Sequence, residues 1–262
     1  MALNHYLSPE AWAEGADPAY EALSRAIVAA SPRSLADRLV LDLGAGTGAT
    51  ARALAAVGAR PVGVDLSLPM LAHDASRRPP AFVADMIRLP MPAACADGAV
   101  AAFSLSHVDD PGAVLAEARR VSRGGAPVIA GVFATAGSRH PAKDVVDALA
   151  RDKGWSPPDW YAHLKDDLEP RVADPETLAA WARAAGLVDV VVEERDVDAG
   201  LYGAQALVGW RLSLPALAPF VSRMTPAVRR AFERAAADAL GPDVQPLRPA
   251  VRILVSVVPA DR

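Results

Sequence analysis

The stretch that decides the fold is VLDLGAGTGAT, at positions 40–50. In it, an apolar run of strand length passes directly into three alternating glycines, Gly44, Gly46 and Gly48, and a segment with helical apolar spacing follows. Glycine permits a tight turn and lets a ligand approach the backbone closely. The free N–H groups at the start of a helix favour an anionic group. The stretch therefore predicts a strand, a ligand-binding loop and a helix.

A carboxylate stands at the end of the next apolar run, about 20 residues after the glycines, at the spacing typical of ribose-binding acids. This residue is Asp65, and its carboxylate can accept hydrogen bonds from both hydroxyls of a ribose. Together with the glycine loop it predicts an adenosine-containing ligand. Gly44, Gly46 and Ala49 also fit the G-x-G-x-x-G/A fingerprint of dinucleotide-binding proteins, so the glycines alone leave two ligands open.

Three features argue against a dinucleotide. Asp42, just before the glycines, suits a ligand with an ammonium group better than a pyrophosphate. Asp85 ends a third apolar run and offers polar groups to an adenine edge. Tyr161 and Lys165 stand four apart, as in short-chain dehydrogenases, but no serine lies about a dozen residues before them. An NAD(P)-dependent oxidoreductase is therefore the minor alternative.

Short apolar runs alternate with helical segments between residues 39 and 133. The runs are almost continuously apolar, as in strands that helices cover on both faces. Such alternation implies a parallel sheet with right-handed crossovers, and hence one doubly wound α/β domain. The seven expected strands are residues 39–43, 60–64, 81–84, 98–104, 127–133, 188–193 and 251–258.

Several helical segments open with the same dipeptide. Asp-Pro occurs at Asp17, Asp110 and Asp174, and Thr225-Pro226 is a close variant. An Asp or Thr side chain caps the first N–H groups of a helix, and proline suits its first turn. We therefore expect a capped helix to begin at each of these four places.

The composition limits the possible function classes. Of 262 residues, 52% are hydrophobic and 22% charged, which excludes wholesale disorder. The net charge of −4, with acids and bases well mixed, argues against a nucleic-acid binder. The single cysteine, Cys95, fits a reducing compartment, and the histidines and this cysteine show no metal-ligand spacing. No apolar run could span a membrane and no signal peptide is recognisable, so we expect a cytoplasmic protein acting on a small molecule.

Five elements in register resemble the class I, Rossmann-like S-adenosylmethionine-dependent methyltransferases of the small-molecule type. The resemblance implies a seven-stranded, mostly parallel sheet with an antiparallel last strand, and S-adenosyl-L-methionine as the cofactor. It also implies in-line methyl transfer to a small, apolar or aromatic metabolite. The five elements are residues 41–48, 62–67, 83–85, 103–107 and 119–125.

The resemblance also implies a cofactor site. The glycines would line the methionine part, and Asp42 would bond to these glycines or to the amino group. Asp65 would hold the ribose, and Asp85 would face the adenine edge. Tyr6, in the N-terminal segment, would cap the site. The full expected set is Tyr6, Asp42, Gly44, Ala45, Gly46, Gly48, Asp65, Leu66, Met70, Asp85, Met86 and Ser104.

His107 is the leading candidate for a general base. It follows the fourth expected strand, where the crevice of an open α/β sheet forms, and an imidazole suits proton abstraction near neutral pH. A base is needed only if the attacking atom of the acceptor carries a proton. His107 could instead orient a loop or cap the helix that begins at Asp110. Tyr161 and His163 are further candidates.

Two insertions, at residues 137–173 and 199–248, interrupt the alternation of strands and helices. We expect a helical cap at residues 1–33 and a methyltransferase domain at residues 34–262 that carries both insertions. All five tryptophans lie outside residues 34–133, which favours a substrate wall over extra packing or a dimer surface. The expected acceptor-binding residues are Trp12, Trp155, Tyr161, His163 and Tyr202.

Other functions stay open at this point. A non-methylating protein of the same fold, either cyclase-like or an interaction module, is the principal alternative to the methyltransferase. The expected partner is a small-molecule methyl acceptor, with neither nucleic acid nor membrane, and a homodimer is compatible with the sequence. The sequence does not specify the acceptor, nor whether oxygen, nitrogen or carbon is methylated.

Overall fold

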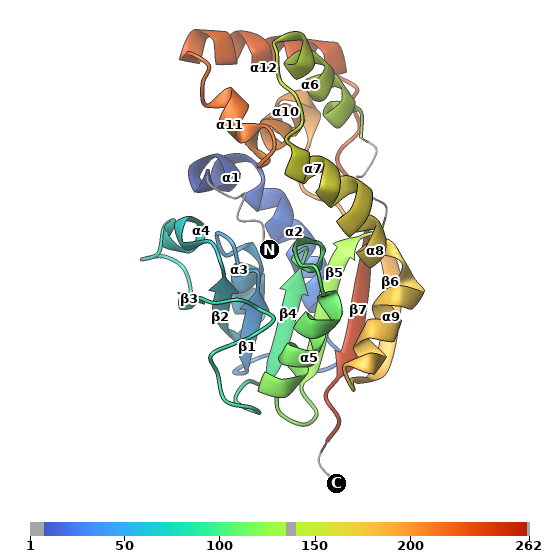
Figure 1. Ribbon diagram of the computed structural model, residues 1–262. Coiled ribbons are helices and arrows are strands. Elements are labelled where there is room, and N and C mark those ends of the chain that lie inside the picture. The colour runs from blue at the N-terminus through green and yellow to red at the C-terminus, as the bar shows by residue number, and fades with distance from the viewer. Residues whose placement is uncertain (1–7, 135–139, 261–262) are drawn as a thin grey trace.

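A computed structural model of the chain describes residues 8–134 and 140–260. Its seven strands form one sheet in the order β3-β2-β1-β4-β5-β7-β6 (Figure 1). Strands β1 to β5 are parallel, and β7 runs antiparallel to both β5 and β6. The predicted doubly wound sheet with an antiparallel last strand is thus confirmed. The strands are β1 (Leu39–Leu43), β2 (Arg60–Asp65), β3 (Ala81–Val83), β4 (Gly98–Ala102), β5 (Pro127–Phe133), β6 (Val188–Asp196) and β7 (Ala250–Val257).

Each face of the sheet packs against helices. Successive residues of β1 belong to different cores: Val40 joins one apolar cluster, whereas Leu41 and Leu43 join another. This alternation explains why β1 is apolar along most of its length. Helices α2 (Asp17–Ala29) and α3 (Ala49–Ala56) contribute to the first cluster, and α5 (Pro111–Val121) and α9 (Pro175–Ala184) contribute to the second.

The strand order reverses between β1 and β4. The chain moves outward from β1 through β2 to β3, then returns to the other side of β1 to form β4 and β5. At such a switch point the connections leave in opposite directions, so a crevice opens at the carboxyl ends of the strands. The glycine loop that follows β1 lies at this edge, as does the short 3₁₀ helix η1 (Leu105–His107) that follows β4.

Three of the four expected caps are present. Asp110, Asp174 and Thr225 each accept a hydrogen bond from a backbone N–H in the first turn of their helix. The expectation for Asp17 is wrong, because Ala16 precedes α2 in a helical conformation, and the N–H of Ala16 bonds back into α1 (Pro9–Gly15). With α1 leading almost directly into α2, the Asp17 carboxylate points to other partners.

A helical layer lies over the carboxyl edge of the sheet (Figure 1). Its apolar cluster includes Trp155, Leu217 and Phe232, and the two expected insertions supply its residues. Among the described residues, no helix is both long and apolar enough to cross a bilayer. The helical layer consists of α1 with α6 (Pro141–Asp152), α7 (Asp159–His163), η2 (Leu164–Leu168), α8 (Glu169–Ala173), α10 (Gly203–Ser213), α11 (Ala218–Val221), α12 (Pro226–Leu240).

Candidate active site

The glycine loop after β1 passes close to the end of β4. Gly44 has a φ of 82°, in the left-handed region that glycine tolerates. A Cβ at this position would lie 2.4 Å from the Cβ of Ser104, so only glycine allows the two backbones to approach so closely. Ser104 adds a hydrogen bond of 2.7 Å from its Oγ to the carbonyl oxygen of Leu43. The loop is therefore held against β4 and leaves its other side open.

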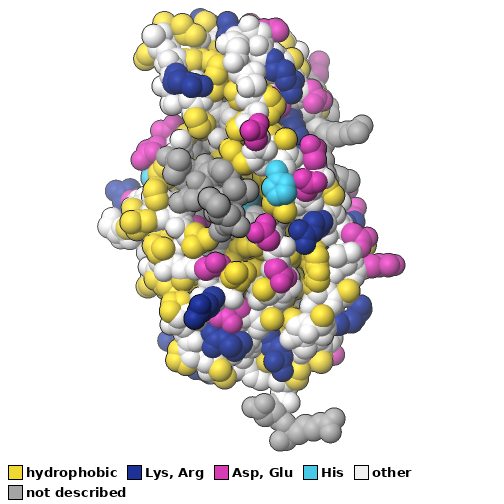
Figure 2. All heavy atoms as spheres, in the orientation of Figure 1, with side chains coloured by type: hydrophobic (Ala, Val, Ile, Leu, Met, Phe, Trp, Pro, Cys, Tyr) yellow, Lys and Arg dark blue, Asp and Glu magenta, His cyan; other side chains and the backbone are white. Residues whose placement is uncertain are grey.

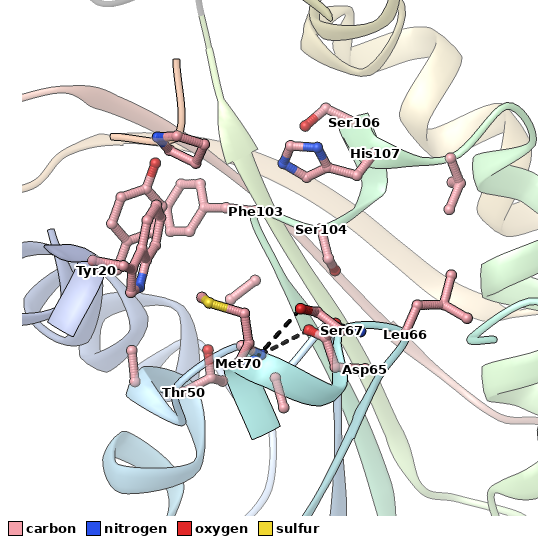
Figure 3. Close-up of a pocket in the computed structure, with 18 of the residues that line it drawn as sticks. Tyr20, Thr50, Asp65, Leu66, Ser67, Met70, Phe103, Ser104, Ser106 and His107 are labelled. Atoms are coloured by element: carbon pink, nitrogen blue, oxygen red, sulfur yellow. Dashed lines mark hydrogen bonds between the residues drawn. The ribbon is translucent and has the colours of Figure 1, made fainter. Parts of the chain in front are cut away.

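Asp65 connects the glycine loop to the turn after β2. Its Oδ2 accepts a hydrogen bond of 2.8 Å from the N–H of Gly46, and its Oδ1 accepts one of 2.8 Å from the N–H of Ser67. Ser67 in turn caps α4 (Leu68–Ala72) by accepting a hydrogen bond from the N–H of Met70 (Figure 3). One carboxylate thus orders both backbone segments that border the crevice.

A large pocket opens between the carboxyl edge of the sheet and the helical layer. The glycine loop and the ends of β2 and β4 form one part of its wall, and the helical layer forms another. Twelve predicted site residues line it: Trp12, Gly44, Ala45, Gly46, Asp65, Leu66, Met70, Asp85, Met86, Ser104, His107 and Tyr161.

His107 ends η1, and its imidazole points into the pocket (Figure 3). The N–H of His107 donates a hydrogen bond of 3.0 Å to the carbonyl oxygen of Ser104, which anchors the short helix directly after β4. The imidazole therefore lies at the switch point of the sheet, on the wall that also presents Phe103.

Asp42 lies behind the glycine loop and does not line the pocket. Its side chain is fully buried, and within the described residues neither carboxylate oxygen has a hydrogen-bond partner. Burial raises the pKa of Asp42 to about 7, although the nearby guanidinium of Arg78 opposes this rise. The sequence predicts that Asp42 bonds to the glycines or to the amino group of the ligand, and the structure places its side chain outside the lining of the pocket. The side chain shares its side of the sheet with Val40, whereas the pocket opens at the carboxyl edge.

Two predicted wall residues belong elsewhere. Trp155 is buried inside the helical layer, where its Nε1 donates a hydrogen bond of 3.0 Å to the carbonyl oxygen of Ala216. Tyr202 is 63% exposed, and its hydroxyl donates to Asp198. The position of these aromatic residues inside an insertion did not reveal which way they face.

Two further predicted residues, His163 and Gly48, also lie outside the pocket. His163 is half exposed and pairs with Asp167, with Nδ1 and Oδ2 2.7 Å apart. Gly48 forms the start of α3 and does not line the pocket. Tyr6 lies outside the described residues.

Four aromatic side chains form one wall of the pocket, which the sequence did not predict. The rings of Trp12 and Tyr20 have centroids 4.7 Å apart, the ring of Tyr20 meets that of Phe103 edge-on at 5.3 Å, and Phe103 packs on Phe133 at 4.6 Å. All four line the pocket. Tyr20 lies within the helix expected after Asp17, and Phe103 and Phe133 lie within expected strands. Only the packing of α2 over the ends of β4 and β5 brings them together.

The pocket also contains polar residues that the sequence did not predict. Asp17 accepts a hydrogen bond from the hydroxyl of Thr47 and pairs with Arg52, so that α2 is tied to the glycine loop. Lys165 and Glu169 form an ion pair on the opposite, helical-layer wall. The pair stands one helical turn apart in the sequence, a spacing that is common on exposed helices and gave no sign of a site.

The fold and the pocket define a Rossmann-like enzyme that binds an adenosine-containing cofactor, and comparison with known proteins identifies the family. Residues 41–130 match the family model described as a methyltransferase domain. A demethylmenaquinone methyltransferase of Mycolicibacterium gilvum is 36% identical over 159 residues, covering 58% of this chain and 68% of that protein. One of Clavibacter sepedonicus is 34% identical over 181 residues, covering 64% of this chain and 71% of that protein.

Solved structures support the same fold. Phosphoethanolamine N-methyltransferase 2 of Haemonchus contortus, in complex with S-adenosyl-L-methionine, matches with a TM-score of 0.57 at 18% identity. This match covers 90% of this chain and 52% of that one. The [4+2]-cyclase SpnF matches with a TM-score of 0.55 at 21% identity and covers 92% and 81% of the two chains.

The chain belongs to the class I S-adenosylmethionine-dependent methyltransferase family. It is a methyltransferase that acts on a small molecule, and S-adenosyl-L-methionine is its cofactor.

Proposed function

We propose that the chain transfers a methyl group in line to a small, apolar or aromatic metabolite. The observation that supports this proposal most strongly is the wall of four aromatic rings, which is continuous with the glycine loop in one pocket. Flat apolar rings pack well against such walls, in offset or edge-to-face arrangements.

The residues of the loop fit the cofactor. Gly44 and Gly46 have left-handed backbone and carry no side chain, so the methionine part can approach the backbone at these two positions. The Asp65 carboxylate, which already accepts two backbone hydrogen bonds, has further lone pairs for the ribose hydroxyls. Leu66 would lie against the adenine, and Asp85 at its polar edge.

When bound, S-adenosyl-L-methionine supplies a methyl carbon to which the acceptor atom bonds while the carbon–sulfur bond breaks and its electron pair goes to sulfur. The walls hold the acceptor in place, and alignment of this kind can supply roughly 7–11 kcal/mol of a barrier. If the acceptor atom carries a proton, His107 is placed to accept it at the imidazole.

The activities after which several relatives are named favour an aromatic acceptor. Several are demethylmenaquinone methyltransferases, which points to a fused ring with oxygen substituents as the first compound class to test. The chain differs from these relatives outside the aligned residues, so the ring system of its own acceptor is to be found by a screen.

A labelled-methyl assay tests the proposal. The chain is incubated with methyl-labelled S-adenosyl-L-methionine and a panel of hydroxylated aromatic and matched aliphatic compounds, and the products are analysed by mass. We expect label in aromatic acceptors, and about tenfold less in a Phe133→Ala variant because it loses one wall of the pocket. The matched control is Phe220→Ala, which alters the helical layer outside the pocket. Label confined to aliphatic acceptors would contradict an aromatic acceptor, and label in none of the compounds would contradict the proposal as a whole.

A further inference from the structure

The helical-layer wall of the pocket contains an ion pair of opposite charges. Lys165, in η2, and Glu169, at the start of α8, both line the pocket and contact each other through Nζ and Oε1. Their side chains are 23% and 10% exposed, so both charges are largely withdrawn from bulk water. A hydrogen bond formed by either group is stronger there than at an exposed site.

An aromatic ring lies beside this pair. The ring centroid of Tyr161 lies 5.5 Å from Nζ of Lys165, and the guanidinium carbon of Arg211 lies 5.7 Å from the same ring. Arg211 is itself neutralised, since its Nε and Nη2 donate hydrogen bonds of 2.7 and 2.8 Å to the two carboxylate oxygens of Asp147. Two cations and two anions are therefore arranged around Tyr161.

The opposite wall contributes a hydroxyl. Burial raises the pKa of Tyr20, and the charge of Glu169 raises it further, so the phenol stays protonated and can donate or accept a hydrogen bond. Near the glycine loop, the Asp17 carboxylate is balanced by Arg52. The Asp65 carboxylate accepts its hydrogen bonds from the glycine loop and the turn after β2, so it lies at the other end of the pocket.

The charge balance at the helical-layer wall restricts what can bind there. A carboxylate on the acceptor would meet the negative charge of Glu169, and an ammonium group would meet the positive charge of Lys165. Because Lys165 and Glu169 neutralise each other, neither offers an unpaired opposite charge to the acceptor. Burial of an uncompensated charge is costly, whereas an uncharged oxygen can take a hydrogen bond from Lys165 and give one to Glu169. The arrangement fits a hydroxyl group on a ring.

We infer that the Lys165–Glu169 pair is the anchor for a neutral ring hydroxyl of the acceptor and selects it over a carboxylate or an ammonium group. This inference rests on the proposed aromatic acceptor and adds the residues that orient it. Lys165 and Glu169 are positioning and specificity residues, distinct from the cofactor-binding groups at the glycine loop.

Binding of four naphthalene probes tests the inference without turnover. The probes are naphthalene, 2-naphthol, 2-naphthoate and 2-naphthylmethylammonium, each titrated at pH 7 in the presence of S-adenosylhomocysteine. The fluorescence of Trp12 and Trp160, which line the pocket, reports binding. In the wild-type chain we expect 2-naphthol to bind about tenfold more tightly than either charged probe.

Two substitutions should change the selectivity in opposite directions. Glu169→Gln removes the negative charge facing Lys165, so 2-naphthoate should gain about tenfold in affinity relative to 2-naphthol. Lys165→Met removes the positive charge, so 2-naphthylmethylammonium should gain by about the same factor. A merely structural role of the pair would weaken all four probes together.

A matched pair on the surface provides the control. Arg229 and Glu233 of α12 also form an ion pair one helical turn apart, outside the pocket, so Glu233→Gln should leave all four affinities unchanged. Titration with S-adenosylhomocysteine shows that each variant is folded. If the probes bind but their ranking ignores both substitutions, the anchor is refuted while the aromatic acceptor stands. If no naphthalene probe binds the wild-type chain, the proposed aromatic acceptor fails, and the anchor fails with it.

Discussion

Asp65 has two tasks at the scale of single residues. Its two carboxylate oxygens order the glycine loop and the turn after β2, and its remaining lone pairs face the pocket. Asp65→Ala should therefore weaken binding of S-adenosylhomocysteine by about 1–3 kcal/mol, because hydrogen bonds to a charged group are lost. Calorimetric titration measures this change. Asp238→Ala, an exposed carboxylate of α12, is the control, and equal affinities in both variants would refute the assignment.

His107 is tested by the pH dependence of turnover. If the imidazole of His107 takes the proton from the attacking atom of the substrate, His107→Ala should lower kcat about 100-fold. The variant should also lose the acidic limb of the pH–rate profile. The affinity for S-adenosylhomocysteine should stay within about twofold of the wild-type value, because the cofactor end of the pocket is intact. Turnover near the wild-type rate would exclude an essential base at this position.

Asp42 predicts a pH dependence of stability. Its pKa rises from 3.8 to about 7 on burial, so between these values the folded chain holds a proton that the unfolded chain has released. The stability contributed by this proton is complete below about pH 4 and is lost as the pH rises through 7. Asp42→Asn keeps the shape of the side chain without its charge. As the pH rises through this range, the free energy of unfolding of the variant should increase relative to that of the wild type by up to about 1.4 kcal/mol per pH unit.

Urea unfolding at pH 5 and pH 8 measures this difference. The groups that act on Asp42 are Arg78 and Arg52, which favour its charged form, and Asp65, which disfavours it. Parallel pH profiles for Asp42→Asn and the wild type would show that Asp42 does not titrate in this range.

The sequence identified those site residues that backbone chemistry requires. Glycines with left-handed φ after one strand, and a carboxylate at the end of the next strand, are typical of loops that bind an adenosine-containing cofactor. Gly44, Gly46 and Asp65 could therefore be predicted from the sequence alone. The aromatic residues could not be sorted in this way. Tyr20 reached the pocket and Trp155 did not, because the direction of each side chain depends on how its helix docks.

At the scale of elements, helix α2 is fixed to the glycine loop by one arginine. Arg52, in α3, pairs with Asp17 and Glu21 of α2 and donates a hydrogen bond of 3.2 Å to the carbonyl oxygen of Thr47. The Asp17-Pro18 signal correctly predicted a helix, but the carboxylate was free to pair with Arg52 because α1 already supplies the preceding turn. A local capping pattern in the sequence does not predict a partner that lies in another helix.

Arg52→Met tests the importance of this connection. The side chain is 37% exposed, so screening by water limits the effect, and we expect the free energy of unfolding to fall by about 1–2 kcal/mol. Arg25→Met provides a matched control, since Arg25 pairs with the same Glu21 but is 61% exposed. It should cost less than about 0.5 kcal/mol in urea denaturation. Equal losses in the two variants would contradict a special role for Arg52.

At the scale of the whole molecule, the seven-stranded sheet carries a helical layer with an apolar cluster of its own. The alternation of strands and helices predicted the parallel part of the sheet, because right-handed crossovers leave few topologies. The family resemblance implied the antiparallel last strand, and the structure supplies the order of the strands. Within the insertions the sequence located the helix that begins after Thr225, but not how the insertion helices pack. Their packing depends on contacts such as that of Trp155 with Ala216, which no sequence period encodes.

The buried pair of Arg211 and Asp147 joins α10 to α6 within this layer. Both side chains are almost inaccessible, at 1% and 8%, and they share two hydrogen bonds. Arg211→Met alone leaves the Asp147 carboxylate buried without its partner and should cost about 3–5 kcal/mol of stability. The double variant Arg211→Met with Asp147→Leu removes both charges and should recover most of that loss, because well-packed apolar side chains can replace a buried pair.

Chemical unfolding and probe binding together locate the effect of this double variant. Its stability should approach the wild-type value, and S-adenosylhomocysteine should bind with unchanged affinity, since the glycine loop lies on the opposite wall. Its affinity for 2-naphthol should fall by less than that of Arg211→Met, because the layer that holds Tyr161 is again well packed. If the double variant is no more stable than Arg211→Met, removing both charges does not restore the layer. The two side chains would then stabilise the layer by more than mutual neutralisation of their charges.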